Sequence, residues 1–365
     1  MTKNVAGAMY RSLHAAILLT FLVVHAKLQA PKKDLKFWNN GRILSDEPRG
    51  QWPVDSVKCL YVQDWSYWFR KKGMQTSTDD VIVAFVASYP EFNTSSSLLN
   101  DLIICSDTKA VDSRVNCYVD LGCGVGSTLL LVSSVLRPKV FSIGVEAQEQ
   151  SVRLLQRTIQ ELPNDAPLIM VAHEDIRSLN PKSVIQMDNV DSTQSISPLE
   201  SLLPNQSLAG QCDLITANPP YAPLRSGTLC KDSQRRSARF ELRGGVEEYL
   251  VTAEALLSAS GRFVLAFWSR DDDRVMKAVA AVETLEVHRR FDVLMGESGR
   301  SDPHLSVYDI RFKSPNHGCI VAKQCEILKL DITRDPMTMG LNNNYKAIRS
   351  LLGCAARPLK ERSNT

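Results

Sequence analysis

The stretch VDLGCGVGS, residues 119–127, decides the fold class of this chain. A β-branched apolar run leads into it and STLLLVSSVL continues with helical periodicity, so Gly122, Gly124 and Gly126 join a strand to a helix. Glycines let the backbone turn tightly there and approach a ligand closely. The spacing is G-x-G-x-G after an acid, Asp120, whereas a pyrophosphate-binding loop has G-x-G-x-x-G. Because a carboxylate repels phosphate, this loop favours a cationic ligand.

Two further acids end the next two predicted strands. Glu146 closes KVFSIGVE (139–146), and Asp175 closes PLIMVAHED (167–175). The carboxyl ends of parallel strands share one crevice, where Glu146 would accept hydrogen bonds from ribose hydroxyls and Asp175 would face an adenine amine. Together with Asp120, these acids favour S-adenosylmethionine as the cofactor, because its ammonium and sulfonium groups are positive.

A second motif stands where the fourth predicted strand, CDLITAN (212–218), ends. Asn218, Pro219, Pro220 and Tyr221 follow one another there. The prolines stop the strand, remove two backbone donors and fix two φ angles. A rigid pocket edge rich in acceptors remains, which suits a planar group carrying an NH₂. For this motif alone, a strand-ending turn with a partly buried tyrosine is the alternative.

The chain around both motifs alternates short strands with helices, which predicts an α/β fold. We expect a doubly wound, mostly parallel, seven-stranded Rossmann-like sheet whose last two strands, joined by a Gly/Ser loop, form an antiparallel hairpin. The predicted strands are 116–122, 139–146, 167–175, 212–218, 261–268, 285–295 and 306–313, and the helices 127–136, 152–162, 245–257 and 272–282.

VDLGCGVGS, GVEAQ (144–148) and NPPY together resemble the class I S-adenosylmethionine-dependent methyltransferases, in the branch that methylates amines. STDDVIVAFVAS (77–88) and ARFELRGGVEEYL (238–250) are similar to segments of the bacterial tRNA adenine-N6 methyltransferases that modify the valine tRNA anticodon loop. The resemblance covers about residues 76–315. It implies that Asn218 and the Pro219 carbonyl accept hydrogen bonds from an adenine amine while Tyr221 stacks on the base.

Other functions remain alternatives. NPPY also serves enzymes that methylate a glutamine amide in translation release factors, and ribosomal RNA adenine or guanine amines are further substrates of this chemistry. From another class, the chain could be a non-catalytic RNA-binding subunit on a methyltransferase scaffold. Retention of Asp120, the glycine loop and NPPY together favours an enzyme.

A basic run, LRSGTLCKDSQRRSARFELR (224–243), follows NPPY and predicts an RNA partner, for which tRNA is the expected class. A solvated charged loop, held by internal ion pairs of Glu241 and Glu247, is the alternative. Upstream, STDDVIVAF predicts a helix that begins with Thr78 or Asp79 as its cap and covers the methionine end of the cofactor. The basic residues of the run are Arg225, Lys231, Arg235, Arg236, Arg239 and Arg243.

The remaining segments predict the domain organisation. Residues 1–33 contain no acid and read as a removable leader, either for import into an organelle (mitochondrion or plastid) or as a secretory signal ending near residue 26 or 30. Their apolar run is too short to span a bilayer. Residues 34–75 form an aromatic-rich segment, 76–315 the methyltransferase domain with an insertion at 180–211, and 316–365 a C-terminal extension.

Two further expectations concern residue types. Trp38, Trp52, Trp65 and Trp68 are expected to pack rather than to stack on bases. Nine cysteines occur without C-x-x-C or zinc-ligand spacing, so we expect no metal site.

Overall fold

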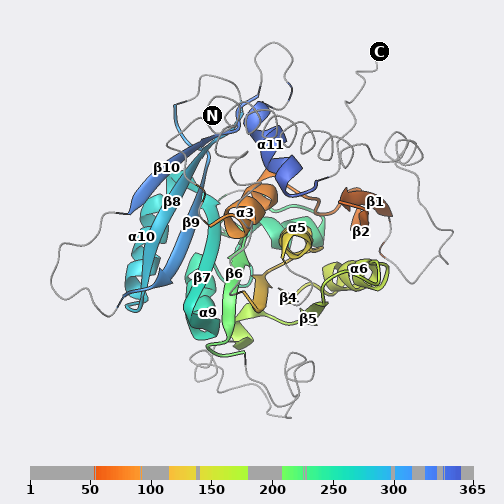
Figure 1. Ribbon diagram of the computed structural model, residues 1–365, viewed down its shortest axis with the longest axis horizontal. Helices are drawn as coiled ribbons and strands as arrows, with labels where there is room; N and C mark the ends of the chain where they lie inside the picture. The colour runs from red at the N-terminus through yellow and green to blue at the C-terminus, as the bar shows by residue number, and fades with distance from the viewer. Residues whose placement is uncertain are drawn as a thin grey trace, which may run out of the picture. The chain divides into compact units, whose positions relative to one another are not determined.

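A mixed sheet of eight strands forms the centre of the fold in the computed structural model (Figure 1). Its strand order is β10-β8-β9-β7-β6-β3-β4-β5. All neighbours pair parallel except β9, which runs antiparallel to both β7 and β8. The strands are β3 (Cys117–Leu121), β4 (Phe141–Glu146), β5 (Ile169–His173), β6 (Cys212–Ala217), β7 (Leu257–Trp268), β8 (Leu285–Leu294), β9 (Leu305–Phe312) and β10 (Glu326–Asp331).

The structure describes residues 53, 55–90, 92, 115–136, 140–179, 208–224, 226, 228–296, 301–314, 325–334, 340 and 342–354. These residues belong to one compact unit that spans 43–354. The expected leader, Trp38, Trp52, Arg225 and most of the 180–211 insertion lie outside the described residues.

The doubly wound, mostly parallel sheet and the C-terminal hairpin of β8 and β9 are confirmed. The expected number of seven strands was wrong, because β10 from the C-terminal extension adds an eighth strand beside β8. β10 is an edge strand in which only Leu328 and Leu330 are buried. Two buried apolar residues in six are too weak a pattern to predict a strand.

Helices cover both faces of the sheet (Figure 1). One face carries α3 (Thr78–Ser88), α5 (Ser127–Val135), α6 (Glu149–Gln160) and α11 (Asn343–Leu351), and the other carries α9 (Val246–Leu256) and α10 (Asp272–Ala281). Consecutive strand residues point to opposite faces. In β7, Val264 therefore enters the first of these two cores, while Phe263 and Leu265 enter the second.

The aromatic-rich segment forms a hairpin of β1 (Ser56–Val62) and β2 (Trp65–Arg70). Trp65 and Trp68 are buried, which confirms for these two residues that the tryptophans pack. The Trp68 indole N–H donates to Glu161 at 3.1 Å, and the Arg157 guanidinium lies 3.5 Å from the ring centroid. The hairpin is thereby fixed against α6.

Candidate functional site

A cleft opens at the carboxyl ends of β3, β4 and β6, where the strand order of the sheet reverses between β3 and β6. Ligands of open α/β sheets bind at this switch point. The cleft encloses about 960 Å³ of space, part of which is open solvent. Eight of the site residues predicted from the sequence line this cleft: Asp120, Gly122, Gly124, Glu146, Asp175, Asn218, Pro220 and Arg243.

The glycine loop adopts the left-handed conformation at all three glycines, with φ of 70° at Gly122, 58° at Gly124 and 88° at Gly126. Their surroundings differ. A Cβ on Gly126 would lie 2.5 Å from a Leu155 methyl, so this glycine packs against α6 and caps α5 outside the cleft lining. A Cβ on Gly124 would meet nothing within 4 Å. The backbone of Gly124 therefore faces open space where a ligand can approach.

Asp120 is buried at the end of β3. Its Oδ1 accepts a hydrogen bond from the Thr216 hydroxyl at 2.6 Å, but its Oδ2 has no partner among the described residues. Burial raises the pKa of this carboxyl to about 8, against the lowering effect of the Thr216 bond. A buried carboxylate oxygen without a partner, in the wall of a cleft, fits a cationic ligand group.

Glu146 holds the loop in place. Its two carboxylate oxygens accept hydrogen bonds from the backbone N–H of Gly124 at 2.9 Å and of Gln148 at 2.6 Å. Burial raises the pKa of Glu146 above its usual value and outweighs these two hydrogen bonds, which act to lower it. The contact of Glu146 with ribose hydroxyls stays a prediction.

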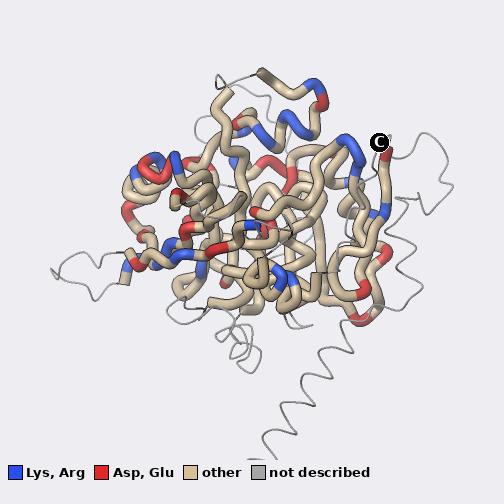
Figure 2. The backbone as a smooth tube through the Cα atoms, turned by 90° about the horizontal axis from the view of Figure 1, so that it is seen from above, with Lys and Arg blue, Asp and Glu red and all other residues tan. Residues whose placement is uncertain are grey.

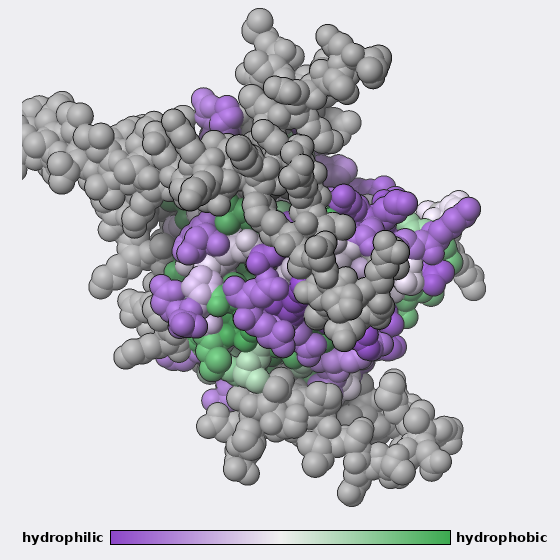
Figure 3. All heavy atoms as spheres, turned by 90° about the vertical axis from the view of Figure 1, so that its right-hand side faces the viewer, coloured by the Kyte–Doolittle hydropathy of each residue, from purple (hydrophilic) through white to green (hydrophobic). Residues whose placement is uncertain are grey.

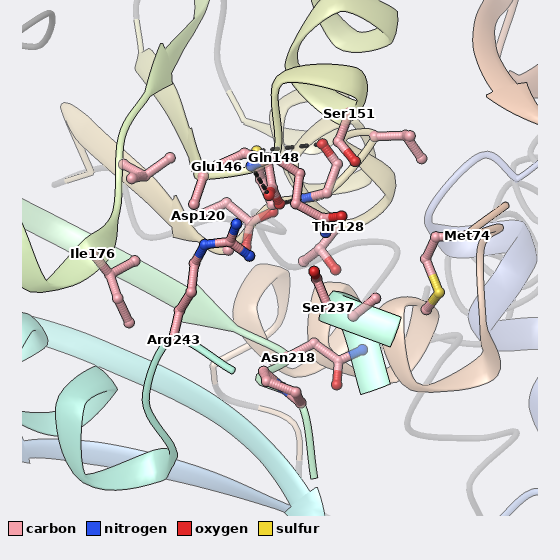
Figure 4. Close-up of a pocket in the computed structure, with 18 of the residues that line it drawn as sticks. Met74, Asp120, Thr128, Glu146, Gln148, Ser151, Ile176, Asn218, Ser237 and Arg243 are labelled. Carbon is pink, nitrogen blue, oxygen red and sulfur yellow. Dashed lines mark hydrogen bonds between the residues drawn. The ribbon is translucent and has the colours of Figure 1, made fainter. Parts of the chain in front are cut away.

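Asp175 lies across the cleft in an ion pair. Arg177 donates two hydrogen bonds to its carboxylate, at 2.9 and 2.8 Å. Burial acts to raise the pKa of Asp175, but the bonds from Arg177 hold it below its usual value. The Arg243 guanidinium also approaches Asp175, at 3.9 Å, and points into the cleft toward Glu146 (Figure 4). Arg243, which the sequence analysis assigned to the basic run for RNA, lies in the cleft lining.

The Asn218 amide makes hydrogen bonds at both ends, one to α3 and one within the NPPY motif. Asn218 Nδ2 donates to Asp80 Oδ1 at 2.8 Å, and Asn218 Oδ1 accepts from the Tyr221 hydroxyl. The same hydroxyl lies 3.2 Å from Asp79 Oδ2, so its single proton is shared between two acceptors. A carbonyl oxygen has two acceptor sites, and Tyr221 occupies one of them. The second site of Oδ1 remains for a substrate donor.

Tyr221 itself packs away from the cofactor side of the cleft. Its ring meets Phe267 edge-on, with centroids 5.2 Å apart, and is tilted against Trp268 at 5.3 Å. Tyr221 and Pro219 are absent from the residues that line the cleft, whereas Asn218 and Pro220 line it. Stacking of Tyr221 on a base therefore stays a prediction, for a substrate on the far side of Asn218.

Asp79 and Asp80 are functional candidates that the sequence analysis did not single out for this role. The N-cap of α3 is Ser77, not Thr78 or Asp79 as expected. Ser77 and Asp80 form a reciprocal capping box, in which Asp80 Oδ2 accepts from the Ser77 backbone at 2.8 Å. The S-x-x-D spacing is the signal that would have located it. Burial raises the pKa of Asp80 to about 6, against the bonds from Ser77 and Asn218.

The basic run is partly helical rather than a loop, because residues Ser233–Arg239 form the short helix α8. Lys231, Arg235 and Arg239 are exposed and Arg236 is half-buried. The ion pairs expected within this run are different: Glu241 and Glu247 both bind Arg274 of α10, at 2.6 and 2.7 Å. Lys231 and Arg235 are therefore not neutralised by these glutamates.

Two features are absent from the described part of the chain. There, no group of three or more His, Cys, Asp and Glu side chains is arranged to hold a metal ion. None of the described helices is long and apolar enough to cross a membrane.

The strand order, with one antiparallel strand between β7 and β8, defines an α/β Rossmann-like methyltransferase fold. No protein-family model matches the chain, and no curated protein matches it. Solved structures that resemble it include a predicted O-methyltransferase from Agrobacterium tumefaciens, with 15% identity, 76% of this chain and 99% of that chain covered, and a TM-score of 0.44.

Two others are a TehB-like SAM-dependent methyltransferase from Corynebacterium glutamicum (17% identity, 58% and 85% covered, TM-score 0.33) and a ribosomal protein L11 methylase from Lactobacillus delbrueckii (10% identity, 59% and 79% covered, TM-score 0.33). Similarities at this level assign no substrate to the chain.

Proposed function

We propose that this protein is an S-adenosylmethionine-dependent N-methyltransferase that methylates the N6 amine of an adenine in RNA, specifically tRNA. The observation that carries the proposal is the orientation of the Asn218 amide. Asp80 accepts from its NH₂ group, so its oxygen is the end that can receive a donor in the cleft. An amine that donates to this oxygen would lie next to Asn218, which is itself part of the cleft lining.

The residues present fit the cofactor. Its ammonium group would pair with Asp120, whose Oδ2 is buried without a partner among the described residues, and its backbone contacts would fall on Gly124. Glu146 and Asp175 lie where the ribose and the adenine of the cofactor would be held. When bound, the cofactor supplies an electrophilic methyl group on a positively charged sulfur.

The chain's own contribution is positioning and electrostatics. The lone pair of an aromatic amine is delocalised into the ring, which makes the nitrogen a poor nucleophile. Hydrogen bonds from the amine to Asn218 Oδ1 and to the Pro219 carbonyl would localise that lone pair on a tetrahedral nitrogen. No general base with a pKa near neutrality is required for this step. A base must leave its stack to enter such a cleft, which favours a loop or single strand.

The test is methyl transfer from labelled S-adenosylmethionine to total small RNA and, in parallel, to a translation release factor. The RNA is digested to nucleosides and the labelled product is identified by mass. We expect N6-methyladenosine. Label in protein glutamine would contradict the RNA substrate while leaving the Asn218 chemistry in place. Absence of binding between cofactor and protein in calorimetry would contradict the whole proposal.

A further inference from the structure

A hollow beside the cleft is lined almost entirely by charged side chains from two segments that are far apart in the sequence. One segment is the end of the β1–β2 hairpin, and the other is the start of α8. Six of the seven lining residues are charged, and none is large and apolar. They are Arg70, Lys71, Lys72, Cys230, Lys231, Asp232 and Arg235.

The acids at this hollow are already paired. Arg70 Nε lies 3.0 Å from Asp55, and Arg70 Nη1 lies 2.9 Å from Asp232. Asp232 also caps α8 by accepting from the Arg235 backbone at 3.0 Å. Burial acts to raise the pKa of Asp232, but these partners hold it below its usual value. Arg70, Asp55 and Asp232 therefore bind the hairpin to the helix.

Four cations remain: Lys71, Lys72, Lys231 and Arg235. All four are exposed, and no ion pair of their side chains occurs within the described part of the chain. Lys and Arg are interspersed with Asp and Glu along the rest of the described chain (Figure 2). The hollow thus concentrates positive charge locally, although the whole chain has a net charge of only +3.

The hollow shares a wall with the cleft. Gln234, buried in α8 next to Arg235, accepts from the Met74 backbone at 3.2 Å and donates to the Ser151 hydroxyl at 2.9 Å. Met74, Ser151 and Ser237 all line the cleft (Figure 4). Lys72 is two residues from Met74 and Arg235 is two residues from Ser237, so the two segments that carry the cations continue into the lining of the cleft.

We propose that this hollow binds the phosphate backbone of RNA on either side of the nucleotide that enters the cleft. Lys71 and Lys72, which follow β2, contribute as much as Lys231 and Arg235 at the start of α8. The inference rests on the proposed function. A nucleotide whose base enters the cleft keeps its neighbouring phosphates outside it, toward the segments that carry these cations. Phosphate contacts of this kind position a nucleic acid without reading its sequence.

The chemistry of the surface favours nucleic acid over a lipid surface. Peripheral membrane binding combines cations with inserted apolar side chains. The lining offers no large apolar side chain for insertion. The described surface on the side of β1, β2 and α6 is also mainly hydrophilic, with a smaller apolar patch (Figure 3).

The experiment measures binding of a fluorescent RNA hairpin with an adenine-containing loop at several KCl concentrations. Two double variants are compared with the wild type: Lys71→Ala with Lys72→Ala, and Lys231→Ala with Arg235→Ala. A control of equal charge change is Lys277→Ala with Lys329→Ala, which lie exposed on α10 and β10. Cofactor affinity is measured by calorimetry for every protein, and vesicles of phosphatidylserine and phosphatidylcholine form a second binding arm.

We expect each of the first two variants to weaken RNA binding about threefold to tenfold per lost contact. The slope of log affinity against log salt should become shallower by about one to two, because each phosphate contact contributes about 0.7–0.9 to it. The control variant and all cofactor affinities should match the wild type. Wild-type RNA affinity and slope in the hairpin variant would overturn the inference and leave the proposed function standing. Vesicle binding without RNA binding would overturn both the inference and the RNA substrate.

Discussion

Replacement of Asp80 by asparagine tests how the reactive amide is oriented. The Asp80 carboxylate accepts two hydrogen bonds, one from the Ser77 backbone N–H and one from Asn218 Nδ2, each 2.8 Å long. In Asp80→Asn, one of these donors must face an NH₂ group. If the helix cap is retained, the Asn218 amide loses its partner or turns over, and its oxygen no longer faces the substrate.

A hydrogen bond to a charged group is worth about 1.5–3 kcal/mol. Because about 1.4 kcal/mol corresponds to a tenfold change in rate, we expect kcat to fall roughly tenfold to 150-fold. The assay is single-turnover methyl transfer with saturating cofactor, and calorimetry should give a cofactor affinity close to that of the wild type. Asp79→Asn is the matched control, because Asp79 receives one bond of 3.2 Å from Tyr221 and can keep it. A kcat of Asp80→Asn within about twofold of the wild type would refute the reasoning.

Three further predictions concern the cleft. Cofactor affinity should rise with pH up to about 8 in calorimetry, because Asp120 must lose its proton to pair with a cation; a flat profile would contradict this role. Gly124→Ala should weaken cofactor binding and also lower Tm, because its φ is positive. Gly126→Ala, whose Cβ also meets Leu155, should lower Tm more and affect cofactor binding less; equal effects of the two variants on cofactor affinity would contradict the assignment. Tyr221→Phe should lower kcat only about twofold to tenfold, the worth of a neutral hydrogen bond, and a complete loss would require another role for the hydroxyl.

The parts of the fold that have strong local patterns were predictable. All seven strands expected from the sequence are present, because buried parallel strands read as short apolar runs and the helices between them have clear periodicity. The β1–β2 hairpin was not predicted, because its turn places Gln63 at a φ of 51° without a glycine to mark it. The edge strand β10 was missed because it buries so few side chains.

The site divides in the same way. Asp120, Glu146 and Asn218 end strands, so the sequence places them at one edge of the sheet, and the cleft contains all three. The partners of Asn218 could not be predicted, since Asp80 lies far away in the sequence and reaches the motif only through the packing of α3 on the sheet. Likewise, the composition of the basic run cannot show that Arg243 lines the cleft while Arg235 does not, since both side chains are exposed.

The most direct test of the account is single-turnover methyl transfer to RNA by the wild type and by Asn218→Ala, each with labelled cofactor already bound. The account predicts that the variant binds the cofactor as tightly as the wild type, keeps its Tm, and forms no N6-methyladenosine. Formation of N6-methyladenosine by Asn218→Ala at the wild-type rate would contradict the claim that the amide of Asn218 positions the reacting amine.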